Sequence, residues 1–513
     1  MERLGFSYFA SREPGRLAVI GPRGDTWTRG QLARLVNSLA RGLLDLGLKP
    51  DDRVAILSPN CVEFLAIYLA ATQVGLYVAT LNWHLAASEI THILKDSQAS
   101  VLFVHRDIFA ATVAPLPAEV LAQVRLISIG EVDGVQSMSN LAASFSGDPL
   151  ERTLPGTTLI YTSATTGLPK AVVKSRDIAE AGLARELELV AQNTRRMGVP
   201  PDSETMYLCI SMLYHIATLN GAVYTLHIGN PLTIMNGWSA VRILEEIQRS
   251  KVKTTFMVPA MFVRLLKLPA DVRNSYDLSS LVCITHGGAP CPVDVKRQMI
   301  EWVGPILFES YGASEGGGTM VESADWLRYP GTVGRPFPGG GIRILDDDGN
   351  EMPAGGVGNI YIKPYNNTTF EYLGDRTKTD AAWRDGYFTV GDVGYVNEEG
   401  FLFICDRRTD MIISSGMKIY SAEVERVLIT HPAIKDCAVV GVADPVLGEA
   451  AVAVVELEDS MTGSAQLSGD ILSFLLERLG SMKVPRRIHY VEQLPRDPSG
   501  KLFKRLLKDK LPA

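Results

Sequence analysis

Short apolar runs alternate with helix-length segments over roughly the first 330 residues of the chain. The runs are rich in β-branched residues and lie at residues 54–57, 101–104, 126–129, 159–161 and 281–284. Uninterrupted apolar strands separated by helices are typical of parallel sheets whose two faces are both covered. The pattern predicts an α/β fold in which helix-covered, mostly parallel sheets form a large N-terminal domain.

The pattern changes after Gly331, where strands alternate with turn signals at residues 346–350, 353–356 and 398–400. Clusters of Asp, Asn, Pro and Gly between strands are typical of hairpins. We therefore expect a small antiparallel, β-barrel-like unit over residues 331–408, which completes an N-terminal domain of residues 1–408.

Residues 409–513 predict a small α+β domain of about a hundred residues. A helix is expected to begin near Ser421, and strands are expected at residues 437–440 and 451–456. A second helix should carry one apolar stripe, formed by Ile471, Leu472, Leu475, Leu476 and Leu479. We interpret the basic, amphipathic stretch at residues 501–510 as a solvated face.

Composition narrows the class of protein. The chain has 513 residues, too many for one hydrophobic core, and its 46% hydrophobic and 21% charged residues are ordinary for a globular protein. A net charge of −7 argues against an extended basic face, so we expect small-molecule partners and no nucleic acid. The six cysteines form no Cys-x-x-Cys pair, which favours a reducing, cytoplasmic setting over a disulfide framework or a zinc site.

The apolar run at residues 64–81 is about the minimum length for a bilayer span, but it contains Gln73 and Gly75. We interpret it as a buried helix that leads into a strand, and we expect no transmembrane segment. The first residues lack a long apolar segment followed by a cleavage site, so no export signal is expected. The oligomeric state is left open, a homodimer included.

A polar loop after the strand expected at residues 159–161 carries the sharpest chemical signal. Its sequence over residues 161–170, Tyr-Thr-Ser-Ala-Thr-Thr-Gly-Leu-Pro-Lys, offers hydroxyls, backbone N–H groups and the ammonium of Lys170. Such groups can surround a polyphosphate, although the loop is not a Walker A sequence. The Gly-x-Pro-Lys ending favours a phosphate loop over a plain polar loop.

This loop resembles the phosphate-binding motif of the adenylate-forming superfamily, which includes acyl-CoA synthetases, adenylation domains of peptide synthetases and firefly-type luciferases. Ala164 and Ala171 depart from glycines of the family pattern Thr-Ser-Gly-Thr-Thr-Gly-x-Pro-Lys-Gly. Alanine at position 164 would cost roughly 1–2 kcal/mol if a left-handed conformation were required there. The remaining family motifs follow in order, so the resemblance covers nearly the whole chain; they lie at residues 14–82, 213–215, 287–290, 309–315, 387–392, 406–410, 414–419 and 495–501.

The resemblance implies a set of site residues. The ATP-binding residues that it implies are Thr162, Ser163, Thr165, Thr166, Gly167, Lys170, Gly288, Ala289, Pro290, Glu309, Ser310, Tyr311, Gly312, Ser314, Asp392, Arg407 and Lys501. The residues implied for the carboxylate substrate are His215, Gly287 and Gly316, and those implied for coenzyme A are Ser415 and Gly416. Thr409 stands at the family's interdomain hinge, where Asp or Lys is usual.

The residue types fit these roles. Tyr311 can offer an aromatic face, and Glu315 offers hard oxygen ligands for Mg²⁺. By the resemblance, Asp392 accepts hydrogen bonds from the ribose hydroxyls and Arg407 donates to the same sugar or to phosphate. A structural role is an equal alternative for His215, and a turn glycine is an equal alternative for Gly416.

The resemblance implies an AMP-forming acid–thiol ligase that uses ATP, Mg²⁺ and coenzyme A. A carboxylate attacks the α-phosphorus and pyrophosphate leaves; the thiol of coenzyme A then attacks the acyl-adenylate and AMP leaves. Lys501 would stabilise the first transition state, and Glu315, through Mg²⁺, would assist departure of pyrophosphate. Because Lys501 lies in the C-terminal domain, that domain is expected to be a mobile lid.

Other functions stay open at this point. A carrier protein or oxygen, as in luciferases, could replace coenzyme A, and a non-catalytic nucleotide sensor is conceivable. No phosphopantetheine site of a carrier domain is visible, which favours a free-standing ligase. The segments at residues 212–221, 285–288 and 316–318 are apolar and small, so we expect a fatty, aryl or steroid-side-chain acid.

Overall fold

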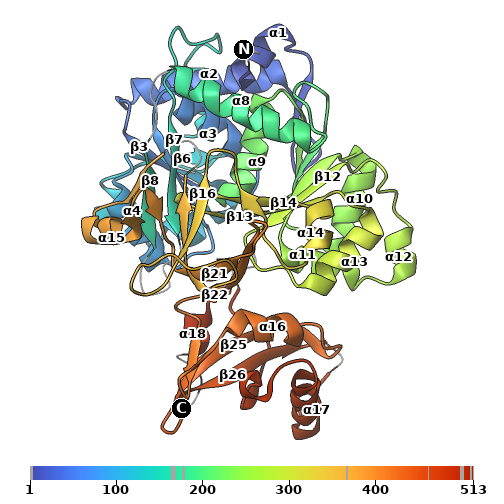
Figure 1. The fold of residues 1–513 in the computed structure, drawn as a ribbon. Helices are drawn as coiled ribbons and strands as arrows, with labels where there is room; N and C mark the ends of the chain where they lie inside the picture. Colours follow the sequence, from blue (N-terminus) through green and yellow to red (C-terminus); the bar gives the residue numbers. More distant parts are fainter. Residues whose placement is uncertain are drawn as a thin grey trace.

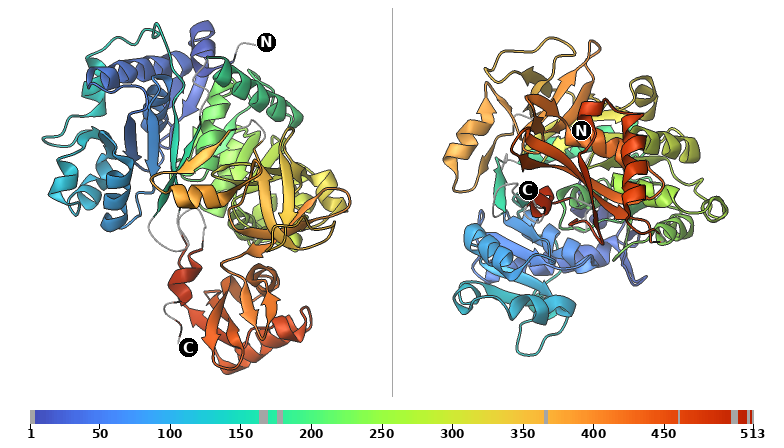
Figure 2. Two further views of the ribbon diagram at one scale, coloured as in Figure 1. Left: turned by 60° about the vertical axis from the view of Figure 1, so that its left-hand side comes forward. Right: turned by 90° about the horizontal axis from the view of Figure 1, so that it is seen from below.

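The computed structural model describes residues 4–162, 169–175, 180–364, 368–459, 461–496, 502–508 and 511. Within these ranges the strands form four sheets of nine, seven, six and five strands. Three sheets and their helices make up one body, and the fourth sheet forms a smaller unit below it (Figures 1 and 2). The expected α/β class, with a further α+β unit at the C-terminal end, is confirmed.

The nine-stranded sheet is parallel through its centre, from β1 to β13, and antiparallel at both edges. Its strands, in spatial order, are β15 (Arg335–Pro336), β14 (Gly316–Glu322), β13 (Leu307–Ala313), β12 (Cys283–Gly287), β11 (Thr254–Met257), β9 (Tyr207–Cys209), β10 (Leu232–Ile234), β1 (Leu17–Ile20) and β2 (Thr26–Thr28). The expected strand at residues 281–284 is β12, which begins two residues later than predicted.

The seven-stranded sheet contains the other strands that the apolar runs predict. Its strands, in spatial order, are β18 (Phe370–Tyr372), β8 (Lys170–Lys174), β7 (Thr157–Thr162), β4 (Tyr77–Leu81), β3 (Arg53–Leu57), β5 (Val101–His105) and β6 (Arg125–Ile129). The five strands from β7 to β6 are parallel, whereas β8 and β18 are antiparallel to their neighbours.

The six-stranded sheet is antiparallel throughout, as the hairpin signals predict. Its strands are β16 (Gly341–Leu345), β17 (Gly358–Lys363), β19 (Trp383–Arg384), β20 (Tyr387–Phe388), β21 (Asp392–Val396) and β22 (Leu402–Arg407). Two short strands from the same stretch of chain lie elsewhere: β15 joins the nine-stranded sheet and β18 joins β8. Residues 331–408 are therefore interwoven with both larger sheets.

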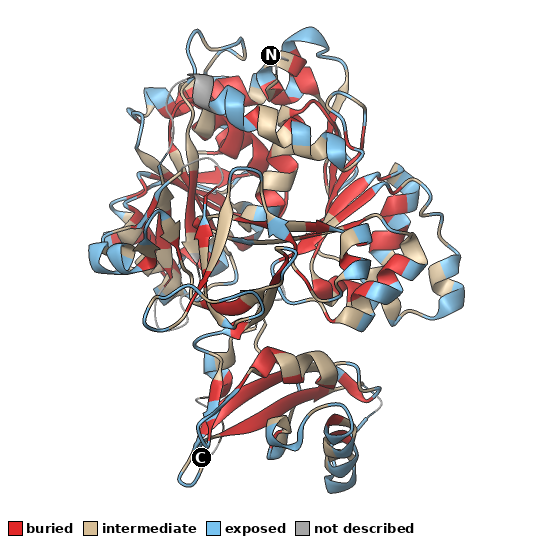
Figure 3. Cartoon of the chain, viewed as in Figure 1, coloured by how far each residue is buried: buried red, intermediate tan, exposed pale blue. Residues whose placement is uncertain are grey.

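Helices cover the two larger sheets, and buried strands lie between them (Figure 3). They are α1 (Phe6–Arg12), α2 (Arg29–Asp45), α3 (Val62–Gln73), α4 (Ala87–Ser97), α5 (Arg106–Val113), α6 (Ala118–Leu121), α7 (Met138–Ala143), α8 (Glu180–Arg196), α9 (Ile216–His227), α10 (Ala240–Ser250), α11 (Pro259–Leu266), α12 (Ala270–Asn274), α13 (Val293–Val303) and α14 (Ser323–Arg328). A further helix, α15 (Arg376–Ala382), follows β18.

The apolar run at residues 64–81 forms the buried helix α3 and continues into β4, as expected. Its helix is buried on all sides because α2 packs on it and the parallel strands lie beneath. In the described part of the chain, no helix is both long enough and apolar enough to span a membrane.

The C-terminal unit is a five-stranded sheet with helices packed on it. Its elements are β23 (Ile412–Ser414), β24 (Met417–Ile419), α16 (Ser421–Leu428), β25 (Ile434–Asp444), β26 (Gly448–Leu457), α17 (Ala465–Leu476), β27 (Arg487–Val491) and α18 (Lys504–Lys508). It contacts the larger body at the end of α11, where the ammonium of Lys267 donates to the carbonyl of Ile434 (3.2 Å) and pairs with Glu458.

Two expectations for this unit are wrong. Leu476 is not part of the buried stripe of α17: it is 55% exposed, whereas Ile471 and Leu475 are buried and Leu479 packs against the same apolar cluster. The stretch after residue 501 is not simply a solvated face. In α18, Leu507 is buried and Lys504 pairs with Glu425 at 2.7 Å.

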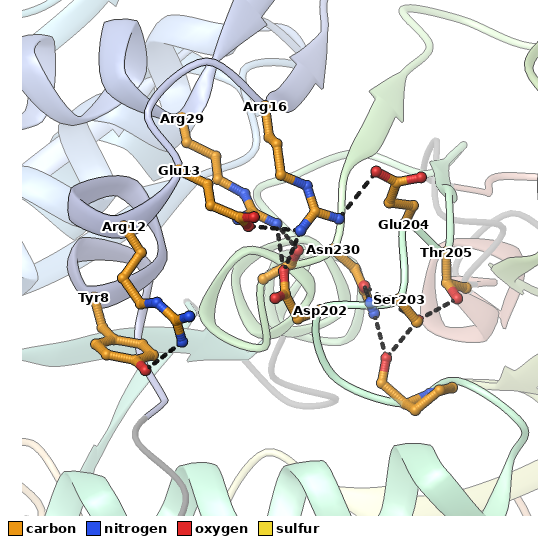
Figure 4. A network of polar contacts seen from close by, with 12 residues as sticks. Tyr8, Arg12, Glu13, Arg16, Arg29, Asp202, Ser203, Glu204, Thr205 and Asn230 are labelled. Carbon is orange, nitrogen blue, oxygen red and sulfur yellow. Dashed lines mark hydrogen bonds and ion pairs between the residues drawn. The ribbon is translucent and has the colours of Figure 1, made fainter.

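A polar network ties α1 to the loop before β9 (Figure 4). The guanidinium of Arg29, which is 3% exposed, pairs with Glu13 (3.0 Å) and Asp202 (2.8 Å) and donates to the carbonyl of Gly229. Arg16 pairs with the same two carboxylates at 2.6 and 2.9 Å. These contacts join segments nearly 200 positions apart in sequence and hold the edge of the nine-stranded sheet.

Candidate functional site

The two segments expected to bracket adenine follow neighbouring parallel strands, β12 and β13. Their register places Gly287 opposite Ser310. A Cβ atom at Gly287 would lie 2.4 Å from the carbonyl oxygen of Ser310, so only glycine permits this approach. Gly288, Ala289 and Pro290 are exposed directly after β12, which places them at the carboxyl edge of the sheet.

Tyr311, Asp392 and Arg407 come together from three strands. The hydroxyl of Tyr311 in β13 donates to Oδ2 of Asp392 at 2.7 Å, and Nε of Arg407 lies 3.5 Å from Oδ1 of the same carboxylate. Asp392 and Arg407 are partners in the β21–β22 ladder, so the backbone fixes their proximity. The structure therefore brings together three residues that the sequence assigns to nucleotide binding.

Burial sets the electrostatics of this trio. It raises the pKa of Asp392, and the charge of Arg407 and the hydrogen bond from Tyr311 oppose that rise. It also raises the pKa of Tyr311, which keeps the phenol protonated and able to donate. Arg407 itself is half-exposed, so its guanidinium can reach a bound molecule.

Glu315, the expected magnesium ligand, lies in the turn between β13 and β14 and is 6% exposed. Its Oε1 accepts a hydrogen bond from the hydroxyl of Tyr372 in β18 at 2.8 Å. Tyr372 was not expected at the site. It reaches Glu315 because β18 leaves the antiparallel unit and pairs with β8.

Lys170 begins β8, and its ammonium pairs with the carboxylate of Asp375. Asp375 precedes α15 and also caps it, since its Oδ1 accepts from the backbone N–H of Lys378 at 3.0 Å. Ala171, where the family pattern has glycine, lies in the strand and has no positive φ, so alanine is tolerated there. Ser163, Ala164, Thr165, Thr166, Gly167 and the side chain of Thr162 lie outside the described residues.

Glu309 has a partner that the sequence does not predict. Its carboxylate pairs at 2.6 Å with the ammonium of Lys296 in α13, and both side chains are buried. His286 is opposite Glu309 in the β12–β13 register, and its Nε2 lies 3.8 Å from Oε2 of Glu309. The ring of Trp326 lies beneath the ammonium of Lys296. The side chain of Glu309 is thus engaged on the helix side of the sheet.

The three glycines after Glu315 differ in what they require. A Cβ atom at Gly318 would lie 2.2 Å from the carbonyl oxygen of Tyr311, and one at Gly317 would lie 2.6 Å from Ile362. Gly318 therefore permits the close packing of β14 on β13, and Gly317 permits the close packing of β14 on Ile362 of β17. At Gly316 no atom of the described residues lies within 4 Å of such a Cβ, so of the three glycines only this one faces open space.

His215 is the residue before α9, and its ring lies 4.4 Å from that of Tyr214, centre to centre. The adjacent Ile216 packs in the same apolar cluster as Tyr311 and Ala313. The start of α9 and the β13–β14 hairpin therefore pack against one apolar cluster, which contains Ile160 and Ile362.

The C-terminal unit presents Ser415 and Gly416 at the exposed tip of the β23–β24 hairpin. Both have positive φ, 49° and 78°, which is typical of a two-residue type I′ turn, so the turn itself accounts for the glycine. Thr409 is exposed just after β22, in a turn closed by the N–H of Met411 and the carbonyl of Arg407 (3.1 Å).

Lys501 lies outside the described residues, but the chain on both sides of it is anchored. Arg496 and Leu502 form an antiparallel bridge, and Arg496 holds Asp436 of β25 with two hydrogen bonds of 2.5 and 2.7 Å. Lys504 donates to Ser421 (2.6 Å) at the start of α16, whose hydroxyl in turn donates to Asp406 (2.8 Å).

No cluster of three or more His, Cys, Asp or Glu side chains that could hold a metal exists among the described residues. The buried carboxylate of Glu315 is hydrogen-bonded only to the neutral hydroxyl of Tyr372 among the described contacts, whereas Asp392 pairs with Arg407 and Glu309 with Lys296. This donor set fits Mg²⁺, which proteins commonly hold through one or two carboxylates plus substrate phosphates and water.

Sequence reasoning missed Lys296, Tyr372, Asp375 and Lys378. The first is a charged residue on an amphipathic helix, a pattern that normally indicates a solvated position. The others lie in or after a three-residue strand whose partner strand is 200 positions earlier in the chain.

Comparison with known proteins agrees with this geometry. Residues 6–372 match the family described as AMP-binding enzyme, and residues 423–501 match the AMP-binding enzyme C-terminal domain. A fatty acid–[acyl-carrier-protein] ligase of Streptomyces coeruleorubidus, ScoC, is 31% identical, covering 98% of this chain and 95% of its own. A feruloyl-CoA synthase of Amycolatopsis sp. is 33% identical, covering 94% of this chain and 93% of its own.

Solved structures give the same result. The chain superposes on o-succinylbenzoate CoA synthetase of Bacillus subtilis in complex with its acyl-adenylate intermediate, with a TM-score of 0.82, 26% identity and coverage of 99% and 98% of the two chains. ATP-bound MatB of Rhodopseudomonas palustris gives a TM-score of 0.82 at 26% identity, covering 98% of each chain. The chain therefore belongs to the AMP-binding enzyme family, the adenylate-forming superfamily that its motifs resemble.

Proposed function

We propose that this chain is an ATP-dependent carboxylate–CoA ligase that forms an acyl-adenylate and then an acyl-CoA thioester. The observation that supports it most is the convergence of Tyr311, Asp392 and Arg407, with Glu315 on the same hairpin as Tyr311. An aromatic ring, an acceptor-only carboxylate and a guanidinium suit a base, a ribose and a phosphate in turn.

In the first half-reaction, a carboxylate oxygen of the acid bonds to the α-phosphorus of ATP. The bond from that phosphorus to the bridging oxygen breaks, and its electron pair leaves with pyrophosphate. We assign Lys501 to hold the carboxylate and α-phosphate together and to stabilise charge that spreads in the transition state. Glu315 would hold Mg²⁺, which supplies charge neutralisation to the phosphates.

In the second half-reaction, the thiol of coenzyme A gives up its proton to solvent and its sulfur attacks the acyl carbon. AMP then leaves with the electron pair of the broken C–O bond. We propose that residues 1–408 bind ATP and acid, and that residues 409–513 move as a lid about Thr409. Such motion would exchange Lys501 for the Ser415–Gly416 turn at the site.

We propose a fatty, aryl or steroid-side-chain acid as the substrate. The open space at Gly316 supports it, together with the small and apolar start of α9, whereas Gly317 and Gly318 are explained by backbone packing and carry no weight. The relatives include a feruloyl-CoA synthase and a long-chain-fatty-acid–CoA ligase, which are named for apolar acids.

A carrier protein is the second candidate acceptor, because one relative is an acyl-carrier-protein ligase at 31% identity.

The expected compartment is the reducing cytoplasm. All six cysteines lie in the described part of the chain and are free thiols.

The test is a panel of carboxylic acids assayed for AMP formation with coenzyme A, with phosphopantetheinylated carrier protein, or with neither. We expect AMP with an apolar acid and coenzyme A, whereas preference for acetate or propionate would contradict the proposed acid class. Two further assays separate the half-reactions: Lys501→Ala should abolish carboxylate-dependent ATP–pyrophosphate exchange and largely spare thioester formation from supplied acyl-adenylate. The wild type forming no AMP with any acid would support the nucleotide-sensor alternative instead.

A further inference from the structure

Lys378 lies on the first turn of α15, close to Tyr372, which contacts Glu315, and to Asp375, which contacts Lys170. Its ammonium is 3.9 Å from the centre of the Tyr372 ring, and the hydroxyl of that same tyrosine donates to Glu315 at 2.8 Å. The ring thus separates a cation from the buried carboxylate expected to hold Mg²⁺. Nothing in the family motifs quoted above includes Lys378.

Asp375 joins Lys378 to the phosphate-loop lysine. One oxygen of the Asp375 carboxylate accepts from the ammonium of Lys170, and the other accepts from the backbone N–H of Lys378. Lys170 lowers the pKa of Asp375 by this hydrogen bond. The ammonium of Lys378 forms no ion pair within the described residues, so its charge is not neutralised by a carboxylate of its own.

The pKa of Lys378 is lowered, first by partial burial and next by the positive charge of Lys170. Two ammonium groups that repel each other beside a carboxylate are stabilised by a polyanion that contacts both. AMP does not supply this charge at that place, because the Tyr311, Asp392 and Arg407 trio binds its base and ribose in the proposed function. The β- and γ-phosphates of ATP do supply it.

We propose that Lys378 binds the β- and γ-phosphates of ATP, and the pyrophosphate that leaves, together with Lys170. This inference rests on the proposed function. Asp375 then acts as the anion that holds Lys170 before the nucleotide arrives, and the incoming phosphates compete with it. Glu315, which accepts a hydrogen bond from the Tyr372 hydroxyl, would hold the Mg²⁺ that neutralises phosphate charge.

A purely structural role for Lys378 is the competing explanation. Tyr372 is 5% exposed, so contact between its ring and the ammonium of Lys378 would contribute to stability in that case. That role predicts no selective change in affinity for any ligand. The two explanations therefore predict different changes in ligand affinity when residue 378 is neutral: a phosphate-binding role predicts weaker binding of ATP and pyrophosphate only, and a structural role predicts no such selectivity.

The experiment measures equilibrium binding of inorganic pyrophosphate, ATP and AMP to the full chain in the presence of Mg²⁺, by isothermal titration calorimetry. Lys378→Gln should weaken pyrophosphate and ATP about 10- to 100-fold, because one charge-assisted hydrogen bond is lost, and should leave AMP within twofold. Lys378→Arg should restore most of the affinity. Arg376→Gln is the matched control: this residue is on the same turn, is fully exposed and pairs only loosely with Asp380 at 3.7 Å.

Arg376→Gln should leave all three affinities within twofold. The inference is overturned if Lys378→Gln binds pyrophosphate as the wild type does, if it loses AMP as much as pyrophosphate, or if the wild type binds neither ATP nor pyrophosphate. These measurements need neither the acid nor the acceptor. A wild type that binds ATP yet forms no AMP would therefore refute the ligase function and still decide the role of Lys378.

Discussion

The Lys296–Glu309 pair gives the sharpest prediction about stability. Both side chains are buried, and the ammonium and carboxylate are 2.6 Å apart. Lys296→Met removes the cation and leaves an unpaired carboxylate under β13, which should cost about 3–5 kcal/mol in free energy of unfolding. Glu309→Met should cost a similar amount, because it leaves the ammonium. The double variant should lie within about 1 kcal/mol of the wild type, since methionines of similar volume replace both charges.

The two single variants should respond to pH in opposite directions. In Lys296→Met, burial raises the pKa of Glu309 above its ordinary value of 4.5, so the folded state holds the proton more tightly and stability falls as pH rises from 4.5 through the raised value. In Glu309→Met, burial lowers the pKa of Lys296 below its ordinary value of 10.5. Stability is then complete above 10.5 and is lost as pH falls through the lowered value.

Urea unfolding of the full chain, followed by circular dichroism at pH 5.5 and pH 8, measures both effects. Arg328→Met is the control, because Arg328 forms an exposed ion pair with Asp325 at 3.9 Å and its loss should cost less than about 1 kcal/mol. A cost below about 1 kcal/mol for Lys296→Met, a double variant as unstable as the singles, or equal pH slopes would refute this reasoning.

Two further predictions concern packing. Arg29→Met should lower the free energy of unfolding by about 2–3 kcal/mol, because it removes the buried donor to two carboxylates and a carbonyl. Arg16→Met should lower it by less than about 1 kcal/mol, because the side chain of Arg16 is 25% exposed. Equal effects in chemical denaturation would contradict the role given to burial. Gly318→Ala should lower the free energy of unfolding by more than about 3 kcal/mol, because its Cβ would lie 2.2 Å from the carbonyl oxygen of Tyr311. Gly237→Ala should lower it by only about 1–2 kcal/mol, because Gly237 has a positive φ but no described atom lies within 4 Å of an added Cβ. Similar melting temperatures for these two variants would count against the close approach.

Much of the candidate site could be predicted because each of its residues belongs to a short sequence motif, and each motif indicates its chemistry without knowledge of the others. Tyr311 and Asp392 are 81 positions apart, yet each was assigned to the nucleotide from its own segment, and their side chains meet. The parallel strands were equally predictable, since strands such as β3 and β5 are buried on both faces and carry continuous apolar runs.

What the sequence could not reveal depends on contacts between distant elements. Lys296 sits on a helix whose pattern is that of a half-exposed surface, and only its packing under β13 shows that it faces Glu309. Tyr372 reaches Glu315 because β18 crosses from one sheet to another, and no local pattern of three residues specifies that partner. Leu476 is likewise exposed although Leu475, its neighbour in α17, is buried, and the apolar pattern alone does not separate the two.

The anchors on either side of Lys501 restrict how that residue can be delivered. Arg496 binds Asp436 of β25 on one side of it, and Lys504 binds Glu425 of α16 on the other. In the proposed reaction, Lys501 would then reach the α-phosphate only when the whole C-terminal unit rotates, because its neighbours Arg496 and Lys504 are bound to that unit. Substitutions at Asp436 or Glu425 would release these neighbours from the C-terminal unit and slow the first half-reaction alone.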